Sequence, residues 1–127
     1  MRPGPIVHPT DFSDGAEPAF LQALEQAARE NRELVLVHVL ETMSELAARK
    51  CMDVLLDRAK ARGLVATDVV IERLVAEEIA KTVRAVGADV VVMGTHGRSR
   101  VMRLLMGSVA ARVLELAPCP VVTVPRV

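Results

Sequence analysis

The sequence predicts an α/β fold in which five parallel strands form one sheet with helices on both faces. Two observations lead to this prediction. Short apolar runs alternate with longer segments of helical period along the whole chain. The run at 34–40 is continuously apolar apart from one histidine, as expected of a parallel strand covered on both sides. Because parallel neighbours need a crossover helix between them, the alternation indicates a parallel sheet.

The first half of the chain contains two strands and two helices. A short strand at 5–8 ends at Pro9. Asp14 and Glu17 have the spacing of a capping box, so we expect Asp14 to cap a helix whose apolar residues recur with a 3.6-residue period. The strand at 34–40 follows, and then a helix from about 44 to 62 that Gly63 terminates.

The second half repeats the alternation. We expect a strand at 69–75, a helix at 77–86, a strand at 88–93, a helix at 108–116 and a strand at 121–124. The prolines at 118 and 120 separate the last helix from the last strand. Five strands with right-handed crossovers favour the flavodoxin-like or Rossmann-like order 3-2-1-4-5.

Composition excludes several classes of protein. The 127 residues carry 16 Lys and Arg against 16 Asp and Glu, so no bias toward polyanions is present. There is no Trp or Tyr, and the two phenylalanines are too few for the stacking platforms of single-stranded nucleic-acid binders. The longest apolar runs, about six to eight residues, are too short for a membrane span. Two cysteines without a C-x-x-C spacing indicate neither a disulfide framework nor a zinc site. We expect one domain over 1–127, cytoplasmic, with no nucleic-acid or membrane partner.

The unusual residues lie in two loops. In a sheet of this order, ligands bind beyond the carboxyl ends of the first and fourth strands, where the strand order reverses. The loop after the first strand contains Asp11, and the loop after the fourth strand reads G-x2-G-x9-G-S from Gly94 to Ser108. Glycines let backbone N–H groups approach a ligand, and a helix that opens at Ser108 offers free N–H groups to phosphate. Four arginines and no carboxylate lie between Asp89 and Glu115, which also favours an anion site.

At these residues the sequence resembles the universal stress protein family, in particular its ATP-binding branch. The resemblance rests on Pro9-Thr10-Asp11-Phe12-Ser13, His38-Val39, the G-x2-G-x9-G-S loop and Pro118-Cys119-Pro120-Val121-Val122. It implies that ATP places its phosphates along Gly97, Gly107, Ser108 and Val109 and its adenine near Thr10, Val39, Met93 and Gly94. It also implies that Asp11 contacts the ribose or helps to hold Mg²⁺ or Mn²⁺, and that two copies pair through the last strand, 121–124. The chain departs from the family at Arg100 and Val75, where a small residue or glycine is common; the arginine either adds charge to the triphosphate site or obstructs it.

The candidate nucleotide-binding residues are therefore Pro9, Thr10, Asp11, Val39, Met93, Gly94, His96, Gly97, Arg98, Gly107, Ser108 and Val109. No catalytic residue is assigned, because no P-loop lysine and no general base at a defined spacing are present. We expect the protein to be an ATP-binding regulatory module of the stress response whose bound state is recognised by partners. We do not expect it to be a fast enzyme. A slow ATPase and a nucleotide-free dimerisation module of the same fold are the alternatives. His38 is expected to be a hydrogen-bonded core histidine, and the role of His8 is left open.

Overall fold

The computed structural model describes residues 3–40, 43–72, 75–95 and 108–125. Its strands are β1 (Ile6–Pro9), β2 (Leu34–Val39), β3 (Ala66–Ile71), β4 (Val90–Gly94) and β5 (Val121–Val124). Its helices are α1 (Glu17–Glu30), α2 (Glu45–Ala61), α3 (Val75–Val86) and α4 (Ser108–Leu116), preceded at α1 by the 3-10 turn η1 (Asp14–Ala16).

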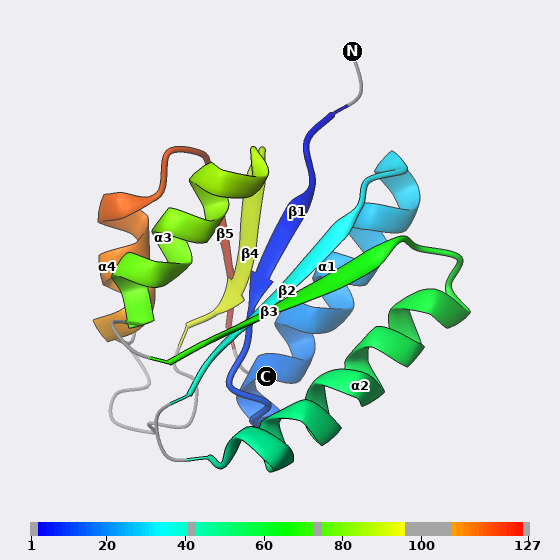
Figure 1. The fold of residues 1–127 in the computed structure, drawn as a ribbon. Helices are drawn as coiled ribbons and strands as arrows, with labels where there is room; N and C mark the ends of the chain where they lie inside the picture. Colours follow the sequence, from blue (N-terminus) through cyan, green and yellow to red (C-terminus); the bar gives the residue numbers. More distant parts are fainter. Residues whose placement is uncertain (1–2, 41–42, 73–74, 96–107, 126–127) are drawn as a thin grey trace.

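The strands form one parallel sheet in the order β3-β2-β1-β4-β5. Helices α1 and α2 lie on one face of the sheet and α3 and α4 on the other (Figure 1). The predicted fold class and strand order are confirmed. No helix in these described ranges is both long and apolar enough to cross a bilayer.

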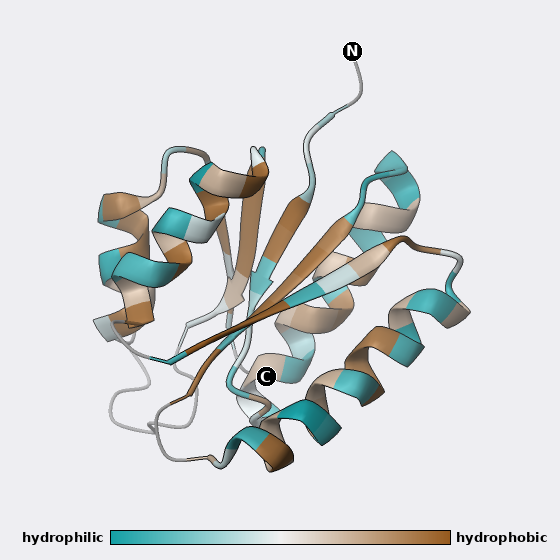
Figure 2. Ribbon diagram, in the orientation of Figure 1, coloured by the Kyte–Doolittle hydropathy of each residue, from teal (hydrophilic) through white to brown (hydrophobic). Residues whose placement is uncertain are grey.

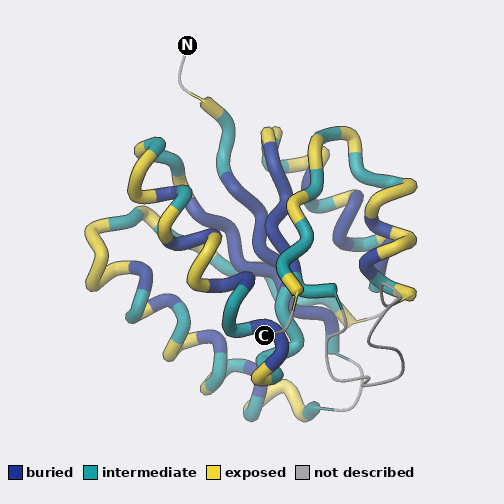
Figure 3. The backbone as a smooth tube through the Cα atoms, turned by 180° about the vertical axis from the view of Figure 1, so that it is seen from behind, coloured by how far each residue is buried: buried dark blue, intermediate teal, exposed yellow. Residues whose placement is uncertain are grey.

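Alternate residues of the central strands fill two separate cores. On β2, Leu34 and Leu36 pack with residues of α1 and α2, whereas Val35 and Val37 pack with residues of α3 and α4. All of β2 is buried, as the continuous apolar run predicts. Figure 2 shows the apolar strands between helices whose outer faces are hydrophilic, and Figure 3 shows the same strands buried at the centre of the molecule.

The predicted capping box at the first helix is wrong. Asp14 opens the η1 turn, and α1 begins only at Glu17, after Ala16, with no side-chain capping bond at either start. The carboxylate of Glu17, which a capping box would turn back onto the backbone, instead accepts a hydrogen bond from Arg58 of α2 at 2.6 Å. A contact between two helices therefore replaces the local motif.

The third strand and the third helix both begin earlier than predicted. The strand lies at 66–71 in place of 69–75, and α3 starts at Val75 in place of 77. Pairing with β2 fixes the register, with Leu36 opposite Asp68. An aspartate is tolerated there because Arg49 of α2 binds its carboxylate at 2.6 Å. The fourth strand, in contrast, begins later than predicted, at 90–94 in place of 88–93.

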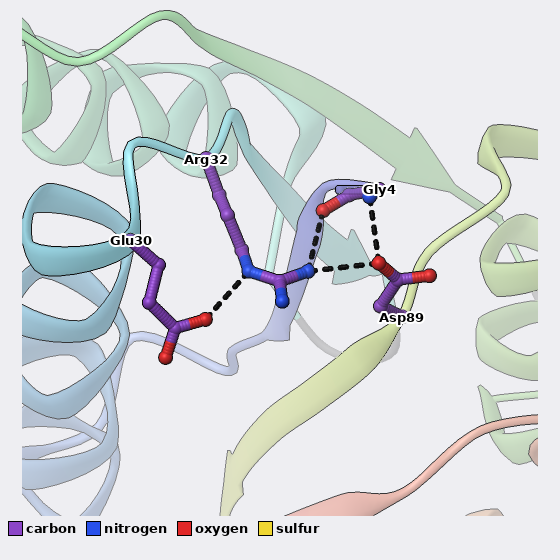
Figure 4. Close-up of polar contacts among 4 residues, drawn as sticks. All are labelled: Gly4, Glu30, Arg32 and Asp89. Atoms are coloured by element: carbon purple, nitrogen blue, oxygen red, sulfur yellow. Dashed lines mark hydrogen bonds and ion pairs between the residues drawn. The ribbon is translucent and has the colours of Figure 1, made fainter. Parts of the chain in front are cut away.

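Four residues tie together the amino ends of the central strands, and we call them the amino-end network: Gly4, Glu30, Arg32 and Asp89. The Arg32 guanidinium donates to the Gly4 carbonyl and to Asp89 Oδ2, both at 2.9 Å, and to Glu30 Oε1 at 2.6 Å (Figure 4). Asp89 Oδ2 also accepts the Gly4 N–H at 2.7 Å. The bonds from Gly4 and Arg32 lower the pKa of the Asp89 carboxyl. The network joins the start of β1 to the starts of β2 and β4.

Candidate functional site

The two central strands β1 and β4 separate toward their carboxyl ends. Their ladder joins Ile6 to Val90 and Val7 to Val91, and within these two strands it extends no further. At the next position the contact between the two strands is made by the imidazole of His8, whose Nδ1 lies 2.8 Å from the carbonyl oxygen of Val92. The strand order reverses between β1 and β4, so this is the place where parallel α/β sheets bind ligands.

His8 is a neutral, fully buried histidine. Burial lowers its pKa to about 4, against the weaker opposing effects of the Val92 carbonyl, Glu17 and Asp11. Because the carbonyl of Val92 accepts, Nδ1 carries the proton and Nε2 is the bare acceptor. Nε2 is buried and has no hydrogen-bond partner in the described chain. The ring also packs against Phe20 of α1, with 5.7 Å between centroids. The side chain of His8 therefore links β1 to β4 just beyond the last backbone pair between them.

The loop at 10–13, directly after β1, is tied down by hydrogen bonds. The Thr10 N–H donates to Val37 O of β2 at 2.8 Å, which prolongs the strand pairing by one residue. Within the loop, Thr10 Oγ1 accepts the Phe12 N–H at 3.0 Å and Asp11 Oδ1 accepts the Ser13 N–H at 2.9 Å. Asp11 therefore closes a turn with one carboxylate oxygen, as a turn aspartate commonly does.

Phe12 and His38 connect this loop to β2. Phe12 has a left-handed backbone, with φ of 63°, which is unusual for a residue with a side chain. Its ring lies over the imidazole of His38, with 4.3 Å between centroids and 31° between the planes. His38 Nδ1 is 2.8 Å from the Thr10 carbonyl oxygen. The prediction that His38 is a hydrogen-bonded core residue is confirmed for Nδ1, while its Nε2 has no partner among the described residues.

The structure places the described candidate residues around the carboxyl edge of the sheet. They are Pro9, Thr10 and Asp11 at the end of β1, Val39 at the end of β2, Met93 and Gly94 at the end of β4, and Ser108 and Val109 at the start of α4. Pro9, Val39 and Met93 are buried, and Ser108 is exposed. His96, Gly97, Arg98 and Gly107 lie outside the described residues, as do Arg100 and Arg103.

The packing of the η1 turn against β4 favours a glycine at position 94, whether or not a ligand binds there. A Cβ built on Gly94 would lie 3.2 Å from the carbonyl oxygen of Gly15, closer than most such contacts. The η1 turn therefore crosses β4 at a distance that favours glycine. This close approach accounts for a glycine at position 94 without a ligand.

The start of α4 provides the other side of the candidate site. In a parallel α/β sheet each helix runs opposite to the strands, so the amino end of α4 lies at their carboxyl edge (Figure 1). The first N–H groups of this nine-residue helix lack intrahelical acceptors. The role of Asp11 as a metal ligand stays a prediction. Among the described residues, no group of three His, Cys, Asp or Glu side chains lies close enough together to hold a metal ion.

Sequence reasoning did not assign any role at the site to Phe12, Ser13 or His8. Ser13 Oγ is buried without a partner in the parts of the chain that the structure describes. One signal was available for Phe12: it is one of two aromatic residues in the chain and lies in a short polar loop. The carbonyl partner of His8 lies on β4 and that of His38 lies in the loop after β1, and no local pattern reveals either contact.

Comparison with known proteins shows the family. The model of the universal stress protein family matches residues 4–54 and 44–125. The chain belongs to the universal stress protein family. This universal stress protein is 26% identical to universal stress protein MJ0577 of Methanocaldococcus jannaschii, over 95% of this chain and 94% of the relative. The solved structure of MJ0577 superposes with a TM-score of 0.88, covering 100% of this chain and 99% of the other.

Two further solved structures contain adenine nucleotides. One is a universal stress protein in complex with cAMP, with a TM-score of 0.80 and 26% identity over 100% of both chains. The other is the universal stress protein from Archaeoglobus fulgidus in complex with dAMP, with a TM-score of 0.78 and 26% identity over 97% of this chain and 98% of that one. The fold and the family are therefore shared with proteins that bind such ligands.

Proposed function

We propose that this universal stress protein binds an adenine nucleotide, ATP in particular, at the carboxyl ends of β1 and β4. The observation that carries the proposal is the separation of β1 and β4 at the reversal of strand order, in a fold shared with the cAMP and dAMP complexes. The composition agrees, because the glycine loop that follows β4 is rich in arginine.

The base and the ribose are assigned to the strand ends. Val39 and Met93 are buried apolar side chains at the ends of β2 and β4, suited to the faces of a purine. Thr10 and Gly94 supply backbone groups for its edge. Asp11 keeps one oxygen on the Ser13 N–H, and its carboxylate is assigned to the ribose or to a Mg²⁺ or Mn²⁺ ion that bridges the phosphates.

The phosphates are assigned to the glycine loop and to the start of α4. The first N–H groups of α4, including that of Val109, and the hydroxyl of Ser108 are assigned to an anion site of the helix-terminus kind. The sequence motif adds Gly97 and Gly107 as positions without a Cβ, and His96 and Arg98 as donors. Binding without rapid hydrolysis follows, because no general base is assigned. The module then acts through partners that recognise its bound state.

Calorimetric titration of ATP, ADP, AMP and cAMP into the purified protein, with and without Mg²⁺, tests the proposal. Mass spectrometry of the supernatant after heat denaturation identifies any nucleotide that co-purifies. We expect ATP to bind in the micromolar range, and G97V and G107V to abolish binding while the circular dichroism spectrum is unchanged. Absence of binding by every nucleotide would favour the nucleotide-free dimerisation module. Phosphate release faster than about 1 s⁻¹ would favour an enzyme.

A matched pair of serines separates anion binding from helix stability. Ser44 caps α2 by accepting the Ala47 N–H at 3.1 Å, whereas Ser108 begins α4 at the candidate site. S44A should lower the free energy of unfolding by about 1 kcal/mol and leave ATP affinity unchanged. S108A should weaken ATP binding severalfold. Equal ATP affinities for the two variants would remove Ser108 from the phosphate site.

Two copies are proposed to pair through β5. This strand lies at the edge of the sheet, pairs with β4 from Val121 to Val124, and leaves Val122 37% exposed. Edge strands readily add another strand. V122K should convert a dimer to a monomer in sedimentation velocity, and an unchanged sedimentation coefficient would place any dimer contact elsewhere.

A further inference from the structure

Both phenylalanines of the chain pack against buried histidines, yet the two pairs differ in what they hold. His8 and Phe20 join β1 to α1, and the carbonyl that His8 binds belongs to β4. His38 and Phe12 join β2 to the 10–13 loop, and the carbonyl that His38 binds is that of Thr10, inside the candidate site. Only the second pair therefore fixes a segment that is proposed to touch the ligand.

The 10–13 loop does not hold its own position. Its two internal hydrogen bonds, from the Phe12 N–H to Thr10 Oγ1 and from the Ser13 N–H to Asp11 Oδ1, close turns but do not attach the loop to the sheet. The left-handed backbone at Phe12 is unfavourable for a residue with a Cβ. External contacts must therefore maintain this conformation.

The described contacts attach the loop to the rest of the molecule at Thr10 and Phe12, and Phe12 also packs against the core under α1 and α2. Val37 O accepts the Thr10 N–H at 2.8 Å and fixes the start of the loop. His38 holds the carbonyl of the same residue through Nδ1, and its ring face supports Phe12 two residues later. His38 is 4% exposed, so the core around it sets the position of its ring.

We propose that His38 is a positioning residue for nucleotide binding. Its Nδ1–H and its ring hold Thr10 and Phe12 so that the backbone of the 10–13 loop and the Asp11 carboxylate face the nucleotide in the required arrangement. His38 acts through the loop and does not itself contact the ligand. This inference rests on the proposed function, because it concerns the same site.

Loss of the His38 contacts should reduce the fraction of molecules whose 10–13 loop is correctly placed to bind the nucleotide. Apparent affinity falls in proportion to that fraction, so a loop that is correctly placed in about one molecule in ten binds about tenfold more weakly. H38A removes both contacts. H38N keeps a donor at the position of Nδ1, and H38F keeps the ring, so each preserves one contact.

The experiment compares these three variants with L36V, which alters the neighbouring inward position of β2 in the same core. ATP affinity is measured by calorimetry, thermal stability by circular dichroism, and loop order by amide hydrogen exchange of Phe12 and Ser13 without ligand. We expect H38A to weaken ATP binding at least tenfold and to exchange these two amides faster, while the amides of β2 stay protected. H38N and H38F should bind ATP more tightly than H38A, and L36V should match the wild type in affinity.

Three results would overturn the inference. They are wild-type ATP affinity in H38A, loss of affinity in L36V equal to that in H38A, and unchanged exchange of the loop amides in H38A. Failure of the wild type to bind any nucleotide is a different result, since it refutes the proposed function. The exchange measurement still reports in that case whether His38 orders the loop.

Discussion

The buried imidazole of His8 predicts that the protein loses stability in mild acid. The folded protein holds this ring neutral, with its pKa lowered to about 4 by burial, whereas in the unfolded chain the ring has an ordinary pKa of 6.5. Between these values the unfolded state binds the proton and the folded state does not. Stability is therefore complete above pH 6.5, falls as the pH drops toward 4, and loses nothing more from this residue below 4.

The size of the effect follows from the difference of the two pKa values. A shift of about 2.5 units corresponds to about 3 kcal/mol over the whole range, and to about 2 kcal/mol at pH 5. Typical domains are stable by only about 5–15 kcal/mol, so such a loss is readily measured. Glu17 and Asp11 oppose the shift, and their effect is already included in the value of about 4.

Urea denaturation at pH 7.5, 6.5, 5.5 and 4.5 measures this loss in the wild type and in H8N. The asparagine keeps a donor for the Val92 carbonyl but does not titrate, so its lower absolute stability should vary less with pH. The difference in unfolding free energy between the two proteins should shrink by about 2 kcal/mol or more from pH 7.5 to 4.5. Parallel curves over this interval would refute the assignment of acid sensitivity to His8.

Three further predictions concern packing and backbone. M52A should lower the free energy of unfolding by about 2–5 kcal/mol, because Met52 lies on the buried face of α2 and is fully buried, whereas L46A on the exposed side of the same helix should lower it by less than about 0.5 kcal/mol in urea denaturation. G94A should lower the melting temperature even without ligand, because its methyl group approaches Gly15 O; an unchanged melting temperature would contradict the close crossing. F12G should weaken ATP binding in calorimetry although it relieves the left-handed backbone, and wild-type affinity would show that the ring is dispensable.

The fold could be predicted from the sequence because its signals are local and repeated. The continuous apolar run of β2 and the alternation of strands and helices determine the class and the strand order. The errors arose where contacts distant in sequence replaced local rules. Glu17 was assigned to a capping box but is bound by Arg58. The third strand was predicted to begin at 69, but it includes Asp68, whose carboxylate pairs with Arg49. Register with β2 then extends β3 to Ala66.

The candidate site stays a prediction, although the structure brings its described residues to one edge of the sheet. The reversal of strand order between β1 and β4 predicts a site at the carboxyl ends of these strands, and the described candidate residues lie along that edge of the sheet. The hydrogen bonds of His8 and His38 connect residues 84 and 28 positions apart, so no spacing rule reveals them. Gly94 was predicted to let a ligand approach, which stays a prediction; the neighbour that the structure shows close to it is the Gly15 carbonyl. The glycine loop from 96 to 107 lies outside the described residues, and its assignment stays a prediction.

The amino-end network has a practical consequence for handling the molecule. It holds Gly4 beside the amino ends of β2 and β4, at the edge of the sheet opposite to the carboxyl ends of the strands (Figure 4). A purification tag or a tether to a sensor surface attached ahead of Gly4 would therefore project away from the region where small molecules are expected to dock. Immobilisation through that edge should leave titrations undisturbed, and a linker there would carry a fluorophore without shielding the far side.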